Sequence, residues 1–213
     1  TWSVGKLVIL EADLSLDNVS FLPIPTFGGI FDGNGHMISG LHITENVTPA
    51  GLFGELQVTG IVKNLTVSGT VVPGGDAQFV GGIVGENYGT ITDCTFTGSI
   101  VGSDNTGAIA GVNAITGKIA GCEAGGTVIG SNMTGGIAGG NLGIIGNSVN
   151  KAYFNTISVD PTIDPEDISF DFLTDYSKLT SLDTSTAAMD TGGIAGYSSG
   201  IIESCTNQAA IGY

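Results

Sequence analysis

The chain has 213 residues, a formal net charge of −15, 36 glycines, five lysines and no arginine. This charge balance argues against binding to nucleic acid or to anionic membrane surfaces, because phosphate contacts require clustered Lys or Arg. No apolar run reaches the roughly 18 residues that a membrane-spanning helix needs.

The first 26 residues predict short strands that cap one end of the fold. Two apolar runs, Leu7–Leu10 and Phe21–Pro25, are separated by polar residues, and the prolines suit an edge position. Such a cap would cover the open end of a stack of repeats, where exposed strand edges would otherwise recruit other chains.

A turn follows at Asp32-Gly33-Asn34-Gly35, whose residue types favour a tight connection between two strands. His36 and His42, the only histidines, lie on either side of the second strand. Because the two histidines are only six positions apart in the sequence, they could in geometric terms share one binding site. The preferred interpretation is that His36 closes the turn and that His42 is a surface residue.

A repeated unit fills most of the remaining sequence. It is clearest at residues 81–94, with the sequence GGIVGENYGTITDC, and it returns at residues 107–122, 135–148 and 192–205, with a looser early version at residues 51–54 and 60–65. Its anchor residues Leu52, Ile83, Ile109 and Ile137 are 31, 26 and 28 residues apart. A period in this range indicates stacked supersecondary units.

Each unit holds short runs of Ile, Val, Thr and Phe between Gly and Asn, which predict strands and turns. Three strands and three turns would fill about 25–30 residues, one coil of a parallel β-helix. Small residues such as Ala110 and Ala138 suit the inside of a narrow coil. Coils would stack at about 4.8 Å, with equivalent residues directly above one another.

The three cysteines test this stacking. Cys94 and Cys205 each lie 11 residues after their anchor isoleucine, and Cys122 takes the same slot one coil after Cys94. Leu65 and Ser148 fill the slot in the other units, so it is predicted to be a buried column. A Cys94–Cys122 disulfide is conceivable, but parallel Cβ vectors do not point at each other, which favours free buried thiols.

A second column is predicted through Asn87, Asn113 and Asn141, with Ser198 in the last slot. Stacked amides can hydrogen-bond from coil to coil, as they do in cross-β stacks. Both columns would be scaffolding.

Residues 155–190 interrupt the repeat and hold eight of the 20 acidic residues. Asp164-Pro165-Glu166-Asp167 is typical of a helix start, which predicts a short amphipathic helix in this insertion. Asp160, Asp164 and Glu166 are also candidate calcium ligands, but they lack a calcium-loop pattern and helix capping explains them without metal. Long insertions in solenoids often emerge on the binding face.

Two parts of the sequence resemble the GLUG-motif repeat domains of bacterial surface and secreted proteins. Ala12-Asp13-Leu14, Pro23-Ile24 and Phe27–Leu41 are similar to their opening module, and the Gly-Gly-Ile-(Val/Ala)-Gly…Asn…Gly-x-Ile-x-x-Cys units are similar to the repeats. The resemblance covers residues 7–154 and 190–213, with departures at Ala108, Ser148 and Ser198. It implies a right-handed parallel β-helix on an exported bacterial protein, and it implies no activity.

A catalytic set is not expected. The chain lacks the arginine base typical of pectate-lyase-like enzymes, and its acids are scattered outside the insertion, with only Glu86 beside a conspicuous turn. No His-Glu-x-x-His helix is present, so a zincin centre is excluded, and no cofactor is implied.

The sequence therefore predicts one all-β solenoid domain, a right-handed parallel β-helix that belongs to a longer protein. It would comprise capping strands (1–26), coils (27–154), an inserted acidic loop or short helix (155–190) and a final coil (191–213). The expected role is a non-enzymatic extracellular stalk or adhesin-like platform, whose partners are a surface glycan, a protein or neighbouring domains. A carbohydrate-binding or polysaccharide-processing β-helix and a spacer beside a catalytic domain are the alternatives. Two or more rings in one acidic groove would favour the carbohydrate alternative, and the rings available are those of Trp2, Tyr88, Tyr153, Tyr176, Tyr197 and Tyr213.

Overall fold

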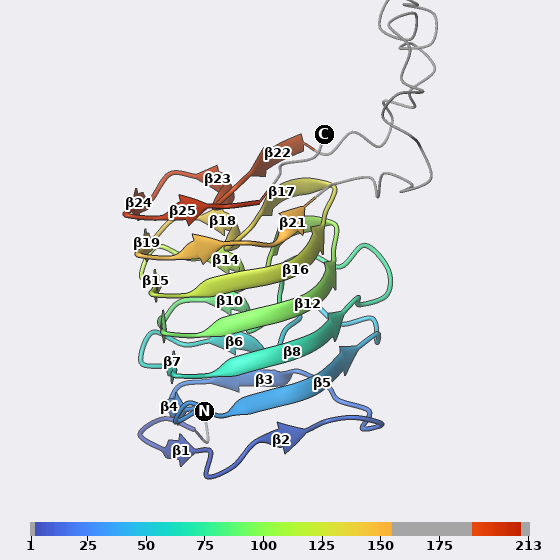
Figure 1. The fold of residues 1–213 in the computed structure, drawn as a ribbon, viewed down its shortest axis with the longest axis vertical. Coiled ribbons are helices and arrows are strands. Elements are labelled where there is room, and N and C mark those ends of the chain that lie inside the picture. The colour runs from blue at the N-terminus through green and yellow to red at the C-terminus, as the bar shows by residue number, and fades with distance from the viewer. Residues whose placement is uncertain (1–2, 155–188, 210–213) are drawn as a thin grey trace, which may run out of the picture.

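The computed structural model describes residues 3–154 and 189–209, and in these ranges every regular element is a β-strand. The strands stack into one tall parallel coil, with the N-terminal end at the bottom of Figure 1 and the last strands at its top. All strand pairs that form the four sheets are parallel and join neighbouring coils. The parallel β-helix predicted from the repeat is confirmed.

Two sheets, A and B, extend along the full height of the stack. Sheet A consists of β1 (Leu7–Ile9), β4 (Ile30–Asp32), β7 (Ile61–Lys63), β11 (Thr90–Thr92), β15 (Lys118–Ala120), β19 (Ile144–Gly146) and β24 (Ile201–Glu203). Sheet B consists of β2 (Leu14–Ser15), β5 (Met37–Ile43), β8 (Thr66–Val71), β12 (Thr95–Val101), β16 (Glu123–Ile129), β20 (Val149–Asn150) and β25 (Thr206–Asn207), with β21 (Tyr153–Phe154) also paired to β16.

The other two sheets, C and D, close each coil. Sheet C consists of β3 (Ile24–Phe27), β6 (Phe53–Leu56), β10 (Val84–Asn87), β14 (Ala110–Asn113), β18 (Ala138–Asn141) and β23 (Ala195–Ser198). Sheet D consists of β9 (Val80–Gly81), β13 (Asp104–Gly107), β17 (Asn132–Gly135) and β22 (Met189–Gly192). In Figure 1 the long strands of sheet B point to the right in front, the chain returns behind them, and it climbs, so the coil is right-handed.

The number of strands in a coil differs from the prediction of three. The coils built from β3–β5 and β6–β8 have three strands, but the later coils have four, because sheet D is added. The glycine-rich run that separates sheets D and C is a tight fold-back rather than one corner. A side chain at Gly111 or Gly139 would overlap the backbone of the sheet D strand beside it, so only glycine permits this close approach.

The anchor residues form the predicted column. Ile83 donates its backbone N–H to Ile109 O (3.2 Å), Ile109 to Ile137 O (3.0 Å) and Ile137 to Ile194 O (2.9 Å). The first three side chains are fully buried. Ile194 therefore stacks directly on Ile137, although the two are 57 residues apart in the sequence, as expected for one coil plus an insertion.

The interior changes in character along the stack. In the first coils Phe27, Phe31 and Phe53 form an aromatic cluster with ring centroids 5.1–6.3 Å apart. Further on, one inward column of sheet B runs from a large ring to small and polar side chains: Phe96, Ala124, Asn150 and Asn207. Ala110 and Ala138 are fully buried, as predicted.

Both predicted polar columns are present. Asn87 Nδ2 donates to Asn113 Oδ1 (2.7 Å), Asn113 Nδ2 to Asn141 Oδ1 (2.8 Å) and Asn141 Nδ2 to Ser198 Oγ (3.1 Å). Ser198 can end this column because its hydroxyl accepts from Asn141 and donates to the carbonyl of Gly200.

The cysteine column is present as well. Cys94 and Cys122 are buried, Cys205 is half-buried, and all three thiols are free, as the sequence favours. A hydrogen bond with the Cys122 thiol, followed by burial, raises the pKa of Cys94. The cysteine column is therefore part of the apolar core.

Candidate functional site

The two histidines lie at opposite ends of β5 and do not face a common site. The backbone N–H of His36 donates to Gly33 O (2.8 Å), which closes the Asp32 turn as predicted, and its Nδ1 lies 3.1 Å from Asp13 Oδ1. His42 is exposed near the other end of β5. The two rings share no site, so the interpretation preferred from the sequence is confirmed.

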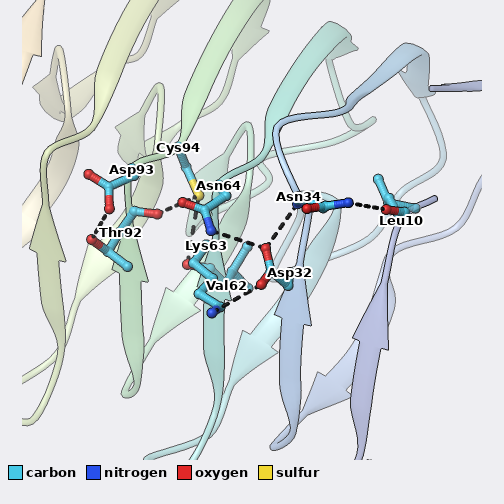
Figure 2. Close-up of polar contacts among 9 residues, drawn as sticks. All are labelled: Leu10, Asp32, Asn34, Val62, Lys63, Asn64, Thr92, Asp93 and Cys94. Carbon is cyan, nitrogen blue, oxygen red and sulfur yellow. Dashed lines mark hydrogen bonds and ion pairs between the residues drawn. The ribbon is translucent and has the colours of Figure 1, made fainter. Parts of the chain in front are cut away.

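Asp32 is the centre of a polar network at the corner between sheets A and B, which Figure 2 shows. Its carboxylate accepts from the backbone N–H of Asn34 (2.9 Å) and from Asn64 Nδ2 (3.1 Å), and it lies 3.0 Å from Lys63 Nζ. The Asn34 N–H, then Lys63 and Asn64, hold the pKa of Asp32 below its usual value. Asn34 lies in the same coil as Asp32, whereas Lys63 and Asn64 lie in the next one, so this network links two coils.

The corner itself forms a column that the sequence did not predict. One residue in each coil has a left-handed backbone there, and the slot accepts only types that tolerate this conformation. Its members are Asn34 (φ 53°), Asn64 (51°), Asp93 (52°), Gly121 (64°), Asn147 (51°) and Ser204 (53°). The available signal was an Asn, Asp, Gly or Ser directly before each cysteine slot.

Glu86 lies in sheet C beside Glu55, its in-register partner on the neighbouring strand. Burial, followed by the charge of Glu55, raises the pKa of Glu86. The charge of Glu86 in turn raises the pKa of Tyr88. Side chains at equivalent positions of neighbouring parallel strands point the same way, so the two Cβ atoms are separated by about one strand spacing, ~4.8 Å.

The substitution Glu86→Gln is expected to stabilise the protein slightly at neutral pH. A raised pKa in the folded state means that ionisation of Glu86 costs stability as the pH rises, and glutamine removes this cost. Because Glu86 is only partly buried, water screens the effect, and we expect the melting temperature at pH 7 to rise by about 1–2 °C, or ~0.5 kcal/mol. Below pH 4.5, the ordinary pKa of the group, the gain should disappear. The control is Glu11→Gln, at an exposed site; a lower melting temperature for Glu86→Gln at pH 7 would contradict the assignment.

A cleft of about 500 Å³ lies beside the loop that connects β2 to β3. The loop contributes Asp17 to Phe21, and β5, β8 and the turn after β5 provide the opposite side. The lining residues are Asp17, Asn18, Val19, Ser20, Phe21, Gly40, Leu41, His42, Thr44, Glu45, Gly69 and Thr70. Its volume lies in the range of small-molecule sites, about 300–1,000 Å³.

Local backbone geometry forms the cleft. Ser15 Oγ donates to Asp17 Oδ2 (2.8 Å) and accepts from the Asp17 backbone N–H (3.1 Å), which fixes the start of the loop. Gly40 has φ 70° at a bulge in β5, and a side chain there would overlap Asp17. The bulge and its glycine therefore let the loop approach the sheet and leave the floor of the cleft bare.

The cleft offers two carboxylates, Asp17 and Glu45, the imidazole of His42, several hydroxyls and the ring of Phe21. This combination accepts and donates hydrogen bonds around an apolar ring and holds no lysine. It suits an uncharged polar ligand better than an anion. The sequence gives no sign of this site, because the loop lies outside the repeat and its residues match no ligand-binding motif.

The remaining predicted candidates are not gathered at one site. Tyr153 lies in sheet B, Tyr197 lies in sheet C, Tyr88 follows β10, and none of the three lines the cleft. Trp2, Tyr176 and Tyr213 lie outside the described residues, as do the predicted helix and the calcium candidates Asp160, Asp164 and Glu166. Among residues 3–154 and 189–209, no three His, Cys, Asp or Glu side chains are grouped to hold a metal. Over the same ranges no helix is long and apolar enough to cross a membrane.

Comparisons with known proteins agree with this architecture. A 90-residue region is 37% identical to halomucin of Haloquadratum walsbyi and covers 42% of this chain but 1% of halomucin. The fold is similar to that of a candidate immunoglobulin A1 protease from Bacteroides ovatus, with a TM-score of 0.60 and 18% identity over 98% of this chain and 71% of the other. An identity this low shows a shared fold alone. Residues 78–101, which span β9 to β12, match the GLUG motif, so one coil of this parallel β-helix carries that motif.

Proposed function

We propose that the chain is a non-enzymatic, extracellular module of a surface protein, in which the β-helix works as a rigid platform or stalk. The observation that carries this proposal is the continuity of the columns. The anchor isoleucines, the asparagines and the corner residues repeat from coil to coil, and their polar groups are satisfied by the neighbouring coil. Most of the repeated residues therefore serve to hold the coils together, and the height of the stack follows from the number of coils. The similarity to halomucin and the GLUG motif support a place at the cell surface.

The distribution of acids supports a scaffold role. Asp32 lies in sheet A, Glu123 in sheet B, Glu86 in sheet C and Asp104 in sheet D, on four different sides of the coil. Glycoside hydrolysis needs two carboxylates that face one bond. Most of the acids in the coils are too dispersed for this.

A coil deletion tests the platform directly. Removal of residues 84–109 joins Ile83 to Ala110 and takes out one period, because Val84 pairs with Ala110 in register. We expect a folded β-rich protein that is shorter by about 4.8 Å, as measured by circular dichroism and by the longest dimension in small-angle X-ray scattering. The control removes only residues 84–96, about half a coil, and should abolish cooperative unfolding, since it turns every later side chain out of its column. If both deletions unfold the chain, the stack is not modular and the platform proposal fails.

The polysaccharide-processing alternative has one specific observation in its favour, the Glu55–Glu86 pair. Carboxyl groups about 5 Å apart, one with a raised pKa, are what a retaining glycosidase uses. The pair lies on sheet C, however, and neither residue lines the cleft. Release of reducing ends from neutral polysaccharides by the purified chain, abolished by Glu86→Gln, would replace the non-enzymatic proposal. Cleavage of immunoglobulin A1 by the purified chain would do the same.

A further inference from the structure

A row of polar side chains leads away from the cleft along the axis of the stack. It begins at His42 of β5, which lines the cleft, and passes through equivalent positions of the neighbouring strands of sheet B. The register aligns His42 with Thr70, Thr70 with Ser99, Ser99 with Thr127, and Thr127 with Tyr153. These strands lie above one another at the front of Figure 1.

The row faces outward. The residues that follow Thr70, Ser99 and Thr127 in the sequence are Val71, Ile100 and Val128, all buried in the core. Because successive side chains of a strand point to opposite faces, the hydroxyls point to the outside. His42 is exposed at one end, and Tyr153, 55% exposed, stands at the other.

The column beside this row has no side chains. Gly69, Gly98 and Gly126 occupy it with φ values of 156°, 157° and 93°, and a Cβ at any of them would overlap the carbonyl of the neighbouring coil. The glycines are partly exposed, so the hydroxyl row is flanked by bare backbone. The four strand spacings from His42 to Tyr153 make a track about 19 Å long.

We propose that the cleft and this track together bind a linear, uncharged oligosaccharide. The terminal sugar lies in the cleft, where Asp17, His42 and Glu45 bind its hydroxyls and Phe21 contacts its apolar face. The following sugars lie along the hydroxyl row, and one of them stacks on Tyr153. This site rests on the platform role proposed above and names the ligand that the platform would hold.

The charge of the site selects against other glycans. Two carboxylates line the cleft, no lysine does, and the whole chain carries −15. An acidic sugar would be repelled. An amino sugar would be attracted through charge alone, without need of the hydroxyl row, and its binding would weaken steeply as salt is raised.

The test is calorimetric titration of the whole chain at 150 mM salt. The probes are maltopentaose, cellopentaose and laminaripentaose, the matching disaccharides, a glucosamine pentamer and a galacturonate pentamer. We expect one neutral pentamer to bind saturably and at least tenfold more tightly than its disaccharide. Preference for either charged pentamer, or no saturable binding of any neutral pentamer, would overturn the proposal.

Variants separate the cleft from the track. Asp17→Asn and His42→Ala should weaken the disaccharide and the pentamer alike, about tenfold. Tyr153→Ala should weaken the pentamer about tenfold and leave the disaccharide unchanged. Thr90→Ala, on sheet A, is the matched control and should change neither, and the melting temperature of each variant reports whether it is folded. If the folded Tyr153→Ala variant binds the pentamer as tightly as the unchanged protein does, the hydroxyl row is not part of the binding site. If the coil deletion behaves as expected and no sugar binds, the platform stands and this site does not.

Discussion

Replacing Gly82 by alanine is expected to lower the free energy of unfolding by about 3 kcal/mol. Gly82 is the second glycine of the fold-back between sheets D and C, and an added Cβ would overlap Cγ and Cδ2 of Phe96 and the carbonyl oxygen of Ala108. Phe96 is fully buried, so its ring has no free space to move into. Urea unfolding followed by circular dichroism measures the change.

The next coil contains the compensating pair. Ala108 takes the slot of Gly82, and the register places Ala124 where Phe96 stands one coil earlier. A methyl group is accepted there because the opposite side chain is small. Phe96→Ala alone should cost about 3–5 kcal/mol through the cavity that it leaves. The double variant should be more stable than the sum of the single effects predicts, by about 2 kcal/mol.

The control for this pair is Gly146→Ala in sheet A. The nearest atom to a Cβ at Gly146 would be Glu203 Cγ at 3.6 Å, an ordinary contact, so the change should stay within about 0.5 kcal/mol. Simple additivity of Gly82→Ala and Phe96→Ala would show that the two residues do not share the space assigned to them.

The substitution Asn113→Ala is expected to destabilise the protein by about 3 kcal/mol. Asn113 is fully buried in the middle of the amide column, where it accepts from Asn87 Nδ2 and donates to Asn141 Oδ1. Alanine removes both partners at once, and each buried polar group left without its partner costs about 1–3 kcal/mol. For a chain of this size the melting temperature should fall by about 6–12 °C.

The end of the same column provides the comparison. Asn87→Leu places at the first slot the residue type that Leu56 already contributes one coil earlier. It deprives Asn113 Oδ1 and the Gly89 N–H of partners, but it regains apolar packing, so the loss should be about half as large. A cost below about 1 kcal/mol for Asn113→Ala would mean that water or a neighbouring coil replaces the amide, and that the column is not a main source of stability.

The stacking of the coils could be predicted because the repeat places the same residue type at the same position of every coil. Ile83, Ile109 and Ile137 form a column for this reason, and so do Cys94 and Cys122. The 57-residue gap between Ile137 and Ile194 could likewise be assigned to one coil plus an insertion, since a solenoid grows by whole coils.

The number of strands within each coil was harder to predict from the sequence. The same glycines that indicate a turn also permit two strands to approach at backbone distance, and the sequence does not distinguish these uses. The fourth strand of the later coils was missed on that account. Residues 155–188, where a helix and calcium ligands were predicted, lie outside the described ranges, so those predictions stand as they were made.

The sequence by itself thus determined the architecture, because periodic spacing of apolar and amide side chains leaves a parallel stack as the arrangement that buries them all. The tertiary structure alone decided the candidate site. The cleft brings Asp17 of one coil to His42 and Glu45 of the next through a loop and a bulge that no repeat contains. The hydroxyl row depends on strand register, which aligns Thr70 with Ser99 and Ser99 with Thr127. Contacts of this kind join residues far apart in the sequence, and their geometry is set only when the coils have closed on one another.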